Sequence, residues 1–195
     1  MSYVNNIKAV LALATEQEIQ DGIMWYMDAY EAARTIADTH ELPLAVVVGV
    51  IAALSPTNRW ERNLIDADNL CEAYVSGGYM EDVLCGTYHP MRAKAWRILQ
   101  DGPELDAQTI ANILNGPKIT DFFWCIQGYD TCVIDGHAWC IANADRRTMQ
   151  EVPNIGKKLR ADLQEAYAAA GIEHGYKAFE VQAITWVVWR RLWNV

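Results

Sequence analysis

The chain has 195 residues, of which 52% are hydrophobic, and its formal net charge at pH 7 is -9. This length suits one domain, or two closely packed lobes, with a sizeable core, and eight tryptophans exclude a disordered chain. The acidic balance argues against non-specific binding to nucleic acid, because contacts to phosphate need lysine and arginine. Local basic clusters remain available for such contacts, at residues 92–97, 146–147, 157–160 and 190–191.

The longest apolar run, Leu42 to Leu54, contains a proline and a glycine and is too short to cross a bilayer. We therefore expect a buried helix there and no membrane association. No basic segment followed by an apolar one opens the chain, so we expect a cytoplasmic protein. The five cysteines form no C-x-x-C pair and the four histidines are scattered, which predicts reduced thiols, no bound metal and no cofactor.

Apolar residues recur at helical spacing and no alternation of period two persists, so the sequence predicts an all-helical fold. Helices are expected at residues 5–14, 19–37, 43–54, 61–75, 90–99, 107–114, 117–127, from about 137, and at 157–170 and 179–193. Residues 76–88 are the least regular stretch. We expect one domain over residues 1–195, with one lobe at about 40–143 and a second from 1–39 plus 144–195.

Two segments of the first half are candidates for contact with a ligand. Trp25 and Tyr26 form an adjacent aromatic pair, which suits either a base-stacking platform or core packing. The polar loop Ser-Pro-Thr-Asn-Arg at 55–59 follows the buried helix, where it would be a binding finger or an ordinary helix connection. Arg92 and Lys94 lie on the next basic helix and would contact nucleic acid or form a solvated face.

Residues 115–137 contain two candidate helix starts that carry reactive side chains. Asn-Gly-Pro at 115–117 is a helix entry, since proline at the first helical position loses no hydrogen bond. Lys118 follows in the first turn, where the positive end of the helix dipole disfavours an ammonium and favours the nucleophilic amine. Asp135 is placed to cap a helix that begins near His137.

Four segments, taken in chain order, resemble the helix-hairpin-helix DNA glycosylases of the endonuclease III superfamily. They are Leu-Ser after the apolar helix, the basic helix, Leu-Asn-Gly-Pro-Lys and Val-Ile-Asp-Gly-His. The likeness covers roughly residues 42–143. In that family a hairpin of the form L-P-G-V-G-x-K binds DNA phosphate through backbone amides, and its lysine attacks the sugar of a flipped nucleotide. Lys118 matches this lysine. Asp135, seventeen residues later, matches the aspartate that assists base departure.

The resemblance implies further contacts with DNA, as a duplex or a distorted duplex with a flipped base. The loop after Leu54 is where the superfamily inserts a wedge into the gap that the flipped base leaves. The residues expected to contact nucleic acid are Ser55, Thr57, Asn58, Arg59, Arg92, Lys94, Asn115 and Gly116. His137 is a candidate acid or base, or else a packing residue.

The chain also departs from the superfamily pattern. Leu114 replaces the first glycine of the hairpin, and the four-cysteine iron–sulfur motif is missing. A second hairpin-like string at 152–158 would either supply the lost phosphate contact or begin a helix. Short motifs at 53–56, 134–138 and 182–191 resemble a group of small phage-encoded and bacterial proteins. A phage-encoded protein would act in the host cytoplasm.

Three functions remain open. The first is a DNA N-glycosylase with AP lyase activity on a damaged or modified base, in which Asp135 stabilises positive charge and Lys118 forms a Schiff base. The second is a phage-type DNA base-hypermodification transferase that acts on a flipped 5-hydroxymethyl pyrimidine, with Asp135 and His137 as acid and base. The third is a non-catalytic DNA- or protein-binding module on the same fold, with the tryptophan-bearing last helix as a surface for a protein partner.

Overall fold

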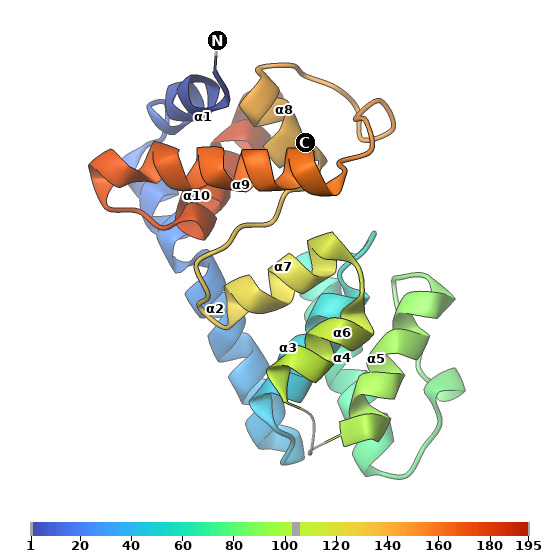
Figure 1. The fold of residues 1–195 in the computed structure, drawn as a ribbon. Helices are drawn as coiled ribbons and strands as arrows, with labels where there is room; N and C mark the ends of the chain where they lie inside the picture. Colours follow the sequence, from blue (N-terminus) through green and yellow to red (C-terminus); the bar gives the residue numbers. More distant parts are fainter. Residues whose placement is uncertain (1, 103–105, 195) are drawn as a thin grey trace. The chain divides into compact units, whose positions relative to one another are not determined.

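The structure is a computed structural model that describes residues 2–102 and 106–194. Every regular element in these ranges is a helix, which confirms the all-helical prediction (Figure 1). The first half contains α1 Tyr3–Leu11, α2 Glu16–His40, α3 Leu44–Leu54, α4 Trp60–Val75, the 3-10 helix η1 Met80–Asp82 and α5 His89–Asp101. The second half contains α6 Ala107–Leu114, α7 Pro117–Ile126, α8 Gly136–Asn143, α9 Lys157–Gly171, the 3-10 helix η3 Ile172–His174 and α10 Ala178–Trp193.

Local capping signals explain most of the helix ends. Asp106 and Asp135 cap α6 and α8, and their carboxylates accept hydrogen bonds from Thr109 N at 2.7 Å and Ala138 N at 2.8 Å. The start of α2 is the main difference from the sequence prediction, which began this helix at residue 19. Glu18 accepts a hydrogen bond from Thr15 N at 2.9 Å and its own N–H donates to Thr15 Oγ1, a capping box that begins the helix earlier.

The chain forms two compact units. The terminal unit is Met1–Met27 with Gly128–Val195, and the central unit is Asp28–Gln127. The boundaries fall within α2 and just after α7, whereas the sequence placed them near residues 39 and 143. The physical reason is the packing of α8, which contacts α1, α9 and α10 and so groups residues 128–143 with the two ends of the chain.

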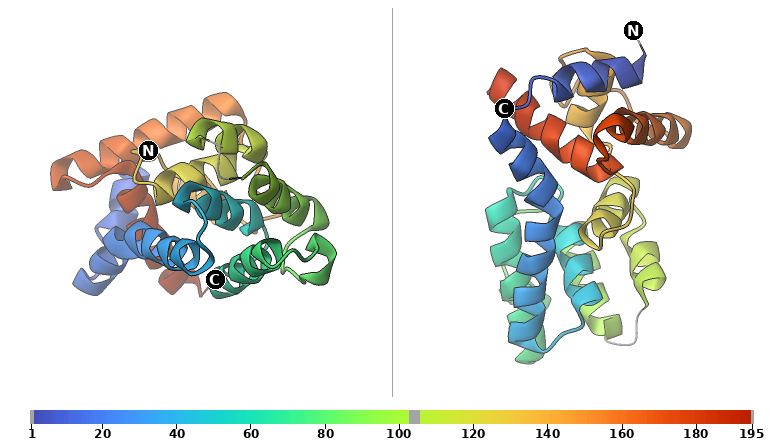
Figure 2. Two further views of the ribbon diagram at one scale, coloured as in Figure 1. Left: turned by 90° about the horizontal axis from the view of Figure 1, so that it is seen from below. Right: turned by 90° about the vertical axis from the view of Figure 1, so that its left-hand side faces the viewer.

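The central unit is built around α3. Val46 to Leu54 are all buried in this helix, and α3 packs against α4, α5, α6 and α7 (Figures 1 and 2). Gly49 allows the close approach of α6, because a Cβ at this position would lie 2.6 Å from Ile110 Cγ2. The long apolar run of the sequence is therefore the core of the central unit.

The terminal unit consists of α1, α8, α9 and α10 with the first part of α2. Gly22 lets α2 and α10 touch, since a Cβ there would lie 2.6 Å from the Cα of Ile184. One turn later the Tyr26 hydroxyl donates to Gln182 Oε1 at 3.1 Å. These contacts fix the beginning of α2 against the last helix.

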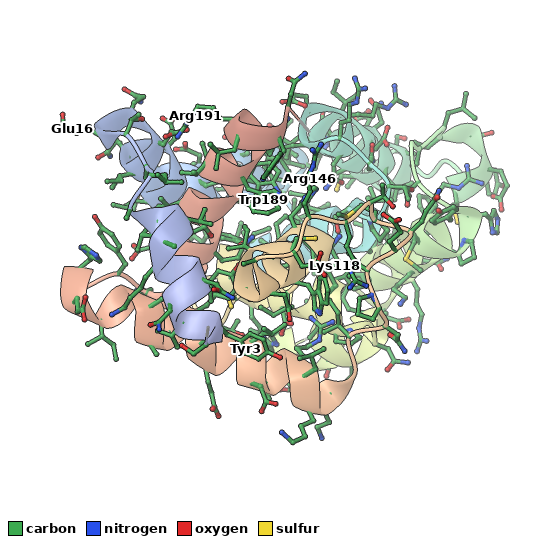
Figure 3. The ribbon with its side chains drawn as sticks, turned by 90° about the horizontal axis from the view of Figure 1, so that it is seen from above. Tyr3, Glu16, Lys118, Arg146, Trp189 and Arg191 are labelled. Carbon is green, nitrogen blue, oxygen red and sulfur yellow. The ribbon has the colours of Figure 1, made fainter. Side chains whose placement is uncertain are left out.

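An ion pair also joins α10 to the start of α2. Arg191 Nε donates to Glu18 Oε1 at 2.6 Å, and Figure 3 shows Arg191 beside the first turns of α2 near Glu16. The Glu18 side chain is only 10% exposed. The hydrogen bond from Arg191 holds the pKa of Glu18 below its ordinary value of 4.5, against the opposing effect of burial.

This pair predicts a pH dependence of stability. Because the folded-state pKa of Glu18 lies below the unfolded value, its contribution is complete above about pH 4.5 and is lost as the pH falls through the folded pKa. We expect Glu18→Gln to lower the free energy of unfolding by about 1–2 kcal/mol at pH 7, a difference that shrinks toward pH 3. Thermal unfolding across this range measures it, with the exposed Glu16→Gln as control. A constant difference between wild type and Glu18→Gln at all pH values would contradict this assignment.

Candidate nucleic-acid interface

The predicted wedge loop, residues 55–59, joins the buried end of α3 to α4. Ser55 caps α3, and its hydroxyl donates to Ala52 O at 2.9 Å. Thr57 is exposed and has a left-handed backbone with φ of 58°. This conformation costs an L-residue about 1–2 kcal/mol, and a β-branched side chain makes it rarer still. Arg59 is exposed and occupies the N-cap position of α4.

A buried carboxylate holds this loop in place. Asp66 on α4 is fully buried and accepts three hydrogen bonds: from Asn58 Nδ2 at 2.9 Å, Arg62 Nε at 2.6 Å and Gly86 N at 2.7 Å. Asp66 therefore ties the wedge loop and a distant segment to one helix. The sequence analysis missed this residue. The i,i+4 spacing of Arg62 and Asp66 was the only local signal, and such pairs are common on exposed helix faces.

The distant segment is Val83 to Tyr88, part of the stretch that lacked regular structure in the sequence analysis. Thr87 Oγ1 donates to Pro56 O at 2.7 Å, and Arg62 Nη2 donates to Leu84 O at 2.9 Å. The segment therefore forms one rigid surface with the wedge loop. Leu84 and Tyr88 project from it with 80% and 60% of their surface exposed.

The cysteine in this segment is not poised as a nucleophile. Burial raises the pKa of the Cys85 thiol to about 11, and the nearby Asp66 carboxylate adds to the effect. Cys71, on the buried face of α4, has its pKa raised to about 12, chiefly by burial as well. Both groups are neutral thiols at physiological pH, and a thiol is a much weaker nucleophile than a thiolate.

Helices α6 and α7 form the predicted helix–turn–helix. Asn115 adopts a left-handed backbone with φ of 44° and closes α6, Gly116 is the N-cap of α7, and Pro117 is its first residue. A surface concavity of about 530 Å³ lies over the turn. Its lining residues are Ala111, Asn112, Asn115, Gly116, Pro117, Thr120 and Asp121. Backbone groups of the turn are thus accessible to a ligand.

Lys118 occupies the second position of α7 and is exposed. The chain has sixteen lysine and arginine residues. Most of them form ion pairs, donate hydrogen bonds or lie on aromatic rings. In the described parts of the central unit, residues 28–102 and 106–127, the cations without such a contact are Arg59 and Lys118.

An aromatic contact relates these two cations. The rings of Trp60 and Phe122 meet edge-on, with their centroids 6.3 Å apart. Trp60 directly follows Arg59, and Phe122 lies one turn after Lys118 on the same face of α7. Arg59 and Lys118 therefore flank one contact between α4 and α7, and both present an unpaired positive charge to solvent.

Asp135 belongs to the terminal unit and is the N-cap of α8, as predicted from the sequence. Its Oδ1 accepts the hydrogen bond from Ala138 N, and its Oδ2 accepts none from the residues that the structure describes. Asp135 is half-buried. One carboxylate oxygen is thus structural, and the other remains available to a ligand.

A polar face of α9 fixes the segment that leads to Asp135. Arg160 Nη1 donates to Ile134 O at 3.1 Å, and Gln164 Nε2 donates to Cys132 O at 3.0 Å. One turn further along α9, the hydroxyl of Tyr167 donates to Ala138 O at 3.1 Å. These three side chains lie at helical spacing and satisfy the carbonyls of an extended segment and a helix start. They hold the Asp135 backbone rigidly.

The comparison with sequence families decides the relationship of the chain. A family of unknown function, DUF7178, matches residues 1–192. The chain belongs to the DUF7178 family. Nothing among the curated proteins or the solved structures matches it.

The remaining predicted site residues have structural contacts in the DUF7178 chain. Arg92 Nη1 donates to Val83 O at 2.6 Å, and Lys94 Nζ donates to Leu114 O, at the end of α6 beside the turn. Desolvation lowers the pKa of the half-buried Lys94. Tyr26 is a core residue, 5% exposed, and Trp25 is half-buried with its ring edge-on to Tyr26. Tyr26 has almost no surface on which a base could stack.

His137 is the second residue of α8, in the terminal unit with Asp135. Its Nδ1 is buried and has no hydrogen-bond partner among the described residues. Burial also raises the pKa of the Cys140 thiol on the same helix. Within residues 2–102 and 106–194 no group of three or more His, Cys, Asp or Glu residues is arranged to hold a metal ion.

A helix that spans a membrane must be both long and predominantly apolar. Taken singly, none of them is long and apolar enough to cross a bilayer. Helices α2 and α3 meet the length and composition test only as a pair, across a bend of 118°.

Proposed function

We propose that this DUF7178 chain is a base-flipping enzyme that acts on DNA, as an N-glycosylase with AP lyase activity on a damaged or modified base. The observation that carries the proposal is the surface of the central unit around Arg59 and Lys118. Two unpaired cations flank one helix contact there, beside a strained loop that a buried carboxylate holds rigid. Such a surface suits a polyanion that must be both bound and deformed.

The wedge loop supports the flipping step. Extruding a nucleotide costs a few kcal/mol of stacking and pairing, and a side chain that fills the gap recovers part of this cost. Thr57 is exposed at the tip of the loop, and Asn58 beneath it is fixed by Asp66. Arg59, next along the chain, would contact a flanking phosphate. A loop that separates stacked bases must keep its conformation, and the hydrogen bonds to Asp66 hold the wedge loop in one conformation.

Lys118 would act as the nucleophile. After its ammonium group gives up a proton to solvent, the amine attacks C1′ of the flipped nucleotide, the glycosidic bond breaks, and the base leaves with the bonding electrons. Loss of the amine proton and opening of the sugar ring then give a Schiff base, from which the strand is cleaved by elimination. In the terminal unit, the Oδ2 of Asp135 accepts no hydrogen bond from a described residue, and a carboxylate oxygen of this kind would stabilise positive charge on a sugar as a base departs.

His137 favours a second candidate function, DNA base hypermodification. Its Nδ1 is buried without a partner, two residues from Asp135. An imidazole nitrogen without a partner in the protein leaves the tautomer of the ring unfixed, so the ring can change its protonation pattern during a reaction. In this candidate the amine of a free amino acid would displace the leaving group of an activated 5-hydroxymethyl pyrimidine in DNA. Asp135 and His137 would exchange the protons, and the glycosidic bond would survive.

The first test is borohydride trapping. Sodium borohydride reduces the Schiff base between Lys118 and C1′ to a stable amine, which links protein and DNA covalently. Duplexes that carry one oxidised, deaminated, alkylated or missing base are incubated with wild-type protein and borohydride. We expect a cross-linked species with wild type and none with Lys118→Ala, a loss of at least about 10²-fold, since the nucleophile is removed.

The matched control is Lys158→Ala. Lys158 is also an exposed lysine at the second position of a helix, but it is paired with Asp162 at 2.8 Å. This variant should trap as well as wild type. Trapping that survives in Lys118→Ala, or that no substrate supports, would remove the lyase assignment. Nucleoside analysis is then applied to DNA that contains activated 5-hydroxymethyl pyrimidines and has been incubated with the protein and free amino acids. A free base indicates excision, and a heavier nucleoside indicates modification. If neither product forms but the protein still binds DNA, the chain is a binding module.

A further inference from the structure

The concavity over the turn between α6 and α7 has a lining that suits an uncharged ligand group. Two amides and a hydroxyl belong to its wall, those of Asn112, Asn115 and Thr120. Its lining residues include no lysine or arginine. Because proteins bind phosphate chiefly through such cations, the concavity itself suits a neutral, hydrogen-bonding group better than a phosphate.

The amide of Asn112 has a fixed orientation. Gln108, one turn earlier on α6, donates from Nε2 to Asn112 Oδ1 at 3.1 Å. The carbonyl side of the Asn112 amide is therefore held toward Gln108, and its NH2 group has no hydrogen-bond partner in the described part of the chain. Since an amide nitrogen carries two N–H donors, Asn112 offers donors at the wall of the concavity.

Asn115 combines a fixed backbone with an uncommitted side chain. Its N–H donates to Ala111 O at 3.1 Å, and its left-handed backbone closes α6. The preceding carbonyl, Leu114 O, accepts the hydrogen bond from Lys94, which anchors the turn to α5. The Asn115 amide itself is exposed and forms no hydrogen bond with a described residue. A rigid turn thus presents a carbonyl acceptor next to N–H donors.

Thr120 and Lys118 lie on adjoining faces of α7. Thr120 N donates to Gly116 O at 2.9 Å, whereas the Thr120 hydroxyl has no partner among the residues that the structure describes. Lys118 is three residues before Asp121, which also lines the concavity, and side chains at this spacing are neighbours on a helix surface. A group bound in the concavity would therefore lie next to the proposed nucleophile.

We propose that this concavity binds the flipped base, and that Asn112 and Asn115 recognise an edge of the base on which a hydrogen-bond acceptor lies next to a donor. A carboxamide pairs with such an edge through two parallel hydrogen bonds, as asparagine does with adenine. The sugar carbon that Lys118 attacks is bonded directly to the base, so the base site has to adjoin Lys118. This inference rests on the proposed function and names part of its substrate site.

The test is a titration of the full chain with free nucleosides, followed in ¹H–¹⁵N NMR spectra. Thymidine presents a carbonyl acceptor next to its N3–H donor, and we expect it to shift the side-chain NH2 signals of Asn112 and Asn115 in a saturable way. 3-N-methylthymidine lacks this donor and should bind about fivefold more weakly, because one hydrogen bond is lost. Inorganic phosphate and 2-deoxyribose should leave both NH2 signals in place.

Two variants remove the amides without adding a charge. Asn112→Ala keeps a helix-forming residue in α6, and Asn115→Gly tolerates the left-handed backbone. Each should weaken thymidine binding about fivefold and reduce its advantage over 3-N-methylthymidine. The matched control is Asn69→Ala, which removes an exposed asparagine from α4 and should bind thymidine as wild type does. The same spectra show whether each variant is folded.

The outcomes separate this inference from the proposed function, because the titration forms no Schiff base. Equal binding of thymidine and 3-N-methylthymidine, or no shift with either nucleoside, overturns the base site even if Lys118 traps DNA. NH2 signals that respond to phosphate in place of thymidine overturn it as well and indicate an anion site. Thymidine binding as expected, without trapping on any duplex, supports the base site and removes only the lyase activity.

Discussion

Asp135→Asn is expected to leave the stability of the protein nearly unchanged and to slow base release by about 10²–10³-fold. Stability and base release respond differently because the two carboxylate oxygens of Asp135 have different roles. Asparagine is as good an N-cap as aspartate, so its side-chain oxygen still accepts the hydrogen bond from Ala138 N. It carries no negative charge, however, and so cannot stabilise the cationic sugar as the base leaves.

The measurement pairs single-turnover base release, on the substrate that traps best, with thermal unfolding. Asp106→Asn is the matched control, because Asp106 caps α6 through the same hydrogen bond, to Thr109 N at 2.7 Å, without a proposed catalytic role. Asp135→Ala should lose the cap as well, about 1 kcal/mol of stability. If Asp135→Asn releases base at the wild-type rate, Asp135 is only a helix cap, and the chain is better described as a binding module.

The second large effect is expected at Asp66. Asp66→Asn should lower the free energy of unfolding by about 3 kcal/mol, because an amide cannot accept all of the hydrogen bonds that converge on the buried carboxylate. An amide NH2 in the place of Oδ2 would leave the donors of both Asn58 and Gly86 unsatisfied, and in the place of Oδ1 it would face the Arg62 guanidinium. The wedge loop and the Val83–Tyr88 segment then separate, so DNA distortion should weaken along with stability.

Urea unfolding measures the stability, and hydrogen exchange of the Gly86 amide reports the local effect, since this N–H donates to Asp66 at 2.7 Å. Asp68→Asn is the control two residues along the same helix. Asp68 is 52% exposed and pairs with His40, so its loss should cost less than about 1 kcal/mol. Wild-type protection of the Gly86 amide in Asp66→Asn would show that the carboxylate does not hold the segment.

The helices could be predicted from the sequence because their signals are local. Pro117 begins α7, Asp106 and Asp135 cap the helices that follow them, and the apolar spacing identifies the buried faces. Each of these signals acts over one or two turns, where helical geometry alone fixes which groups meet. Even the early start of α2 was encoded locally, in the capping box of Thr15 and Glu18.

The candidate site was predictable only in part. Lys118 and Arg59 could be selected as cations at helix starts, and the structure places both of them exposed and unpaired among the described residues. Arg92 and Lys94 fit the same pattern, yet each donates to a backbone carbonyl of the central unit. Composition does not distinguish these cases, because whether a basic side chain is free depends on acceptors that other segments bring to it.

The sequence by itself therefore determined the all-helical class, the helix positions and the caps, all of which depend on neighbours within a turn or two. Only the tertiary structure decided that residues 128–143 pack with the chain ends and that Asp66 joins the wedge loop to Gly86. It also decided that Arg146 lies on the ring of Trp193. Those features join residues that are far apart in the chain. Periodicity carries no information about such partners, because it reports which face is buried and not what the face is buried against.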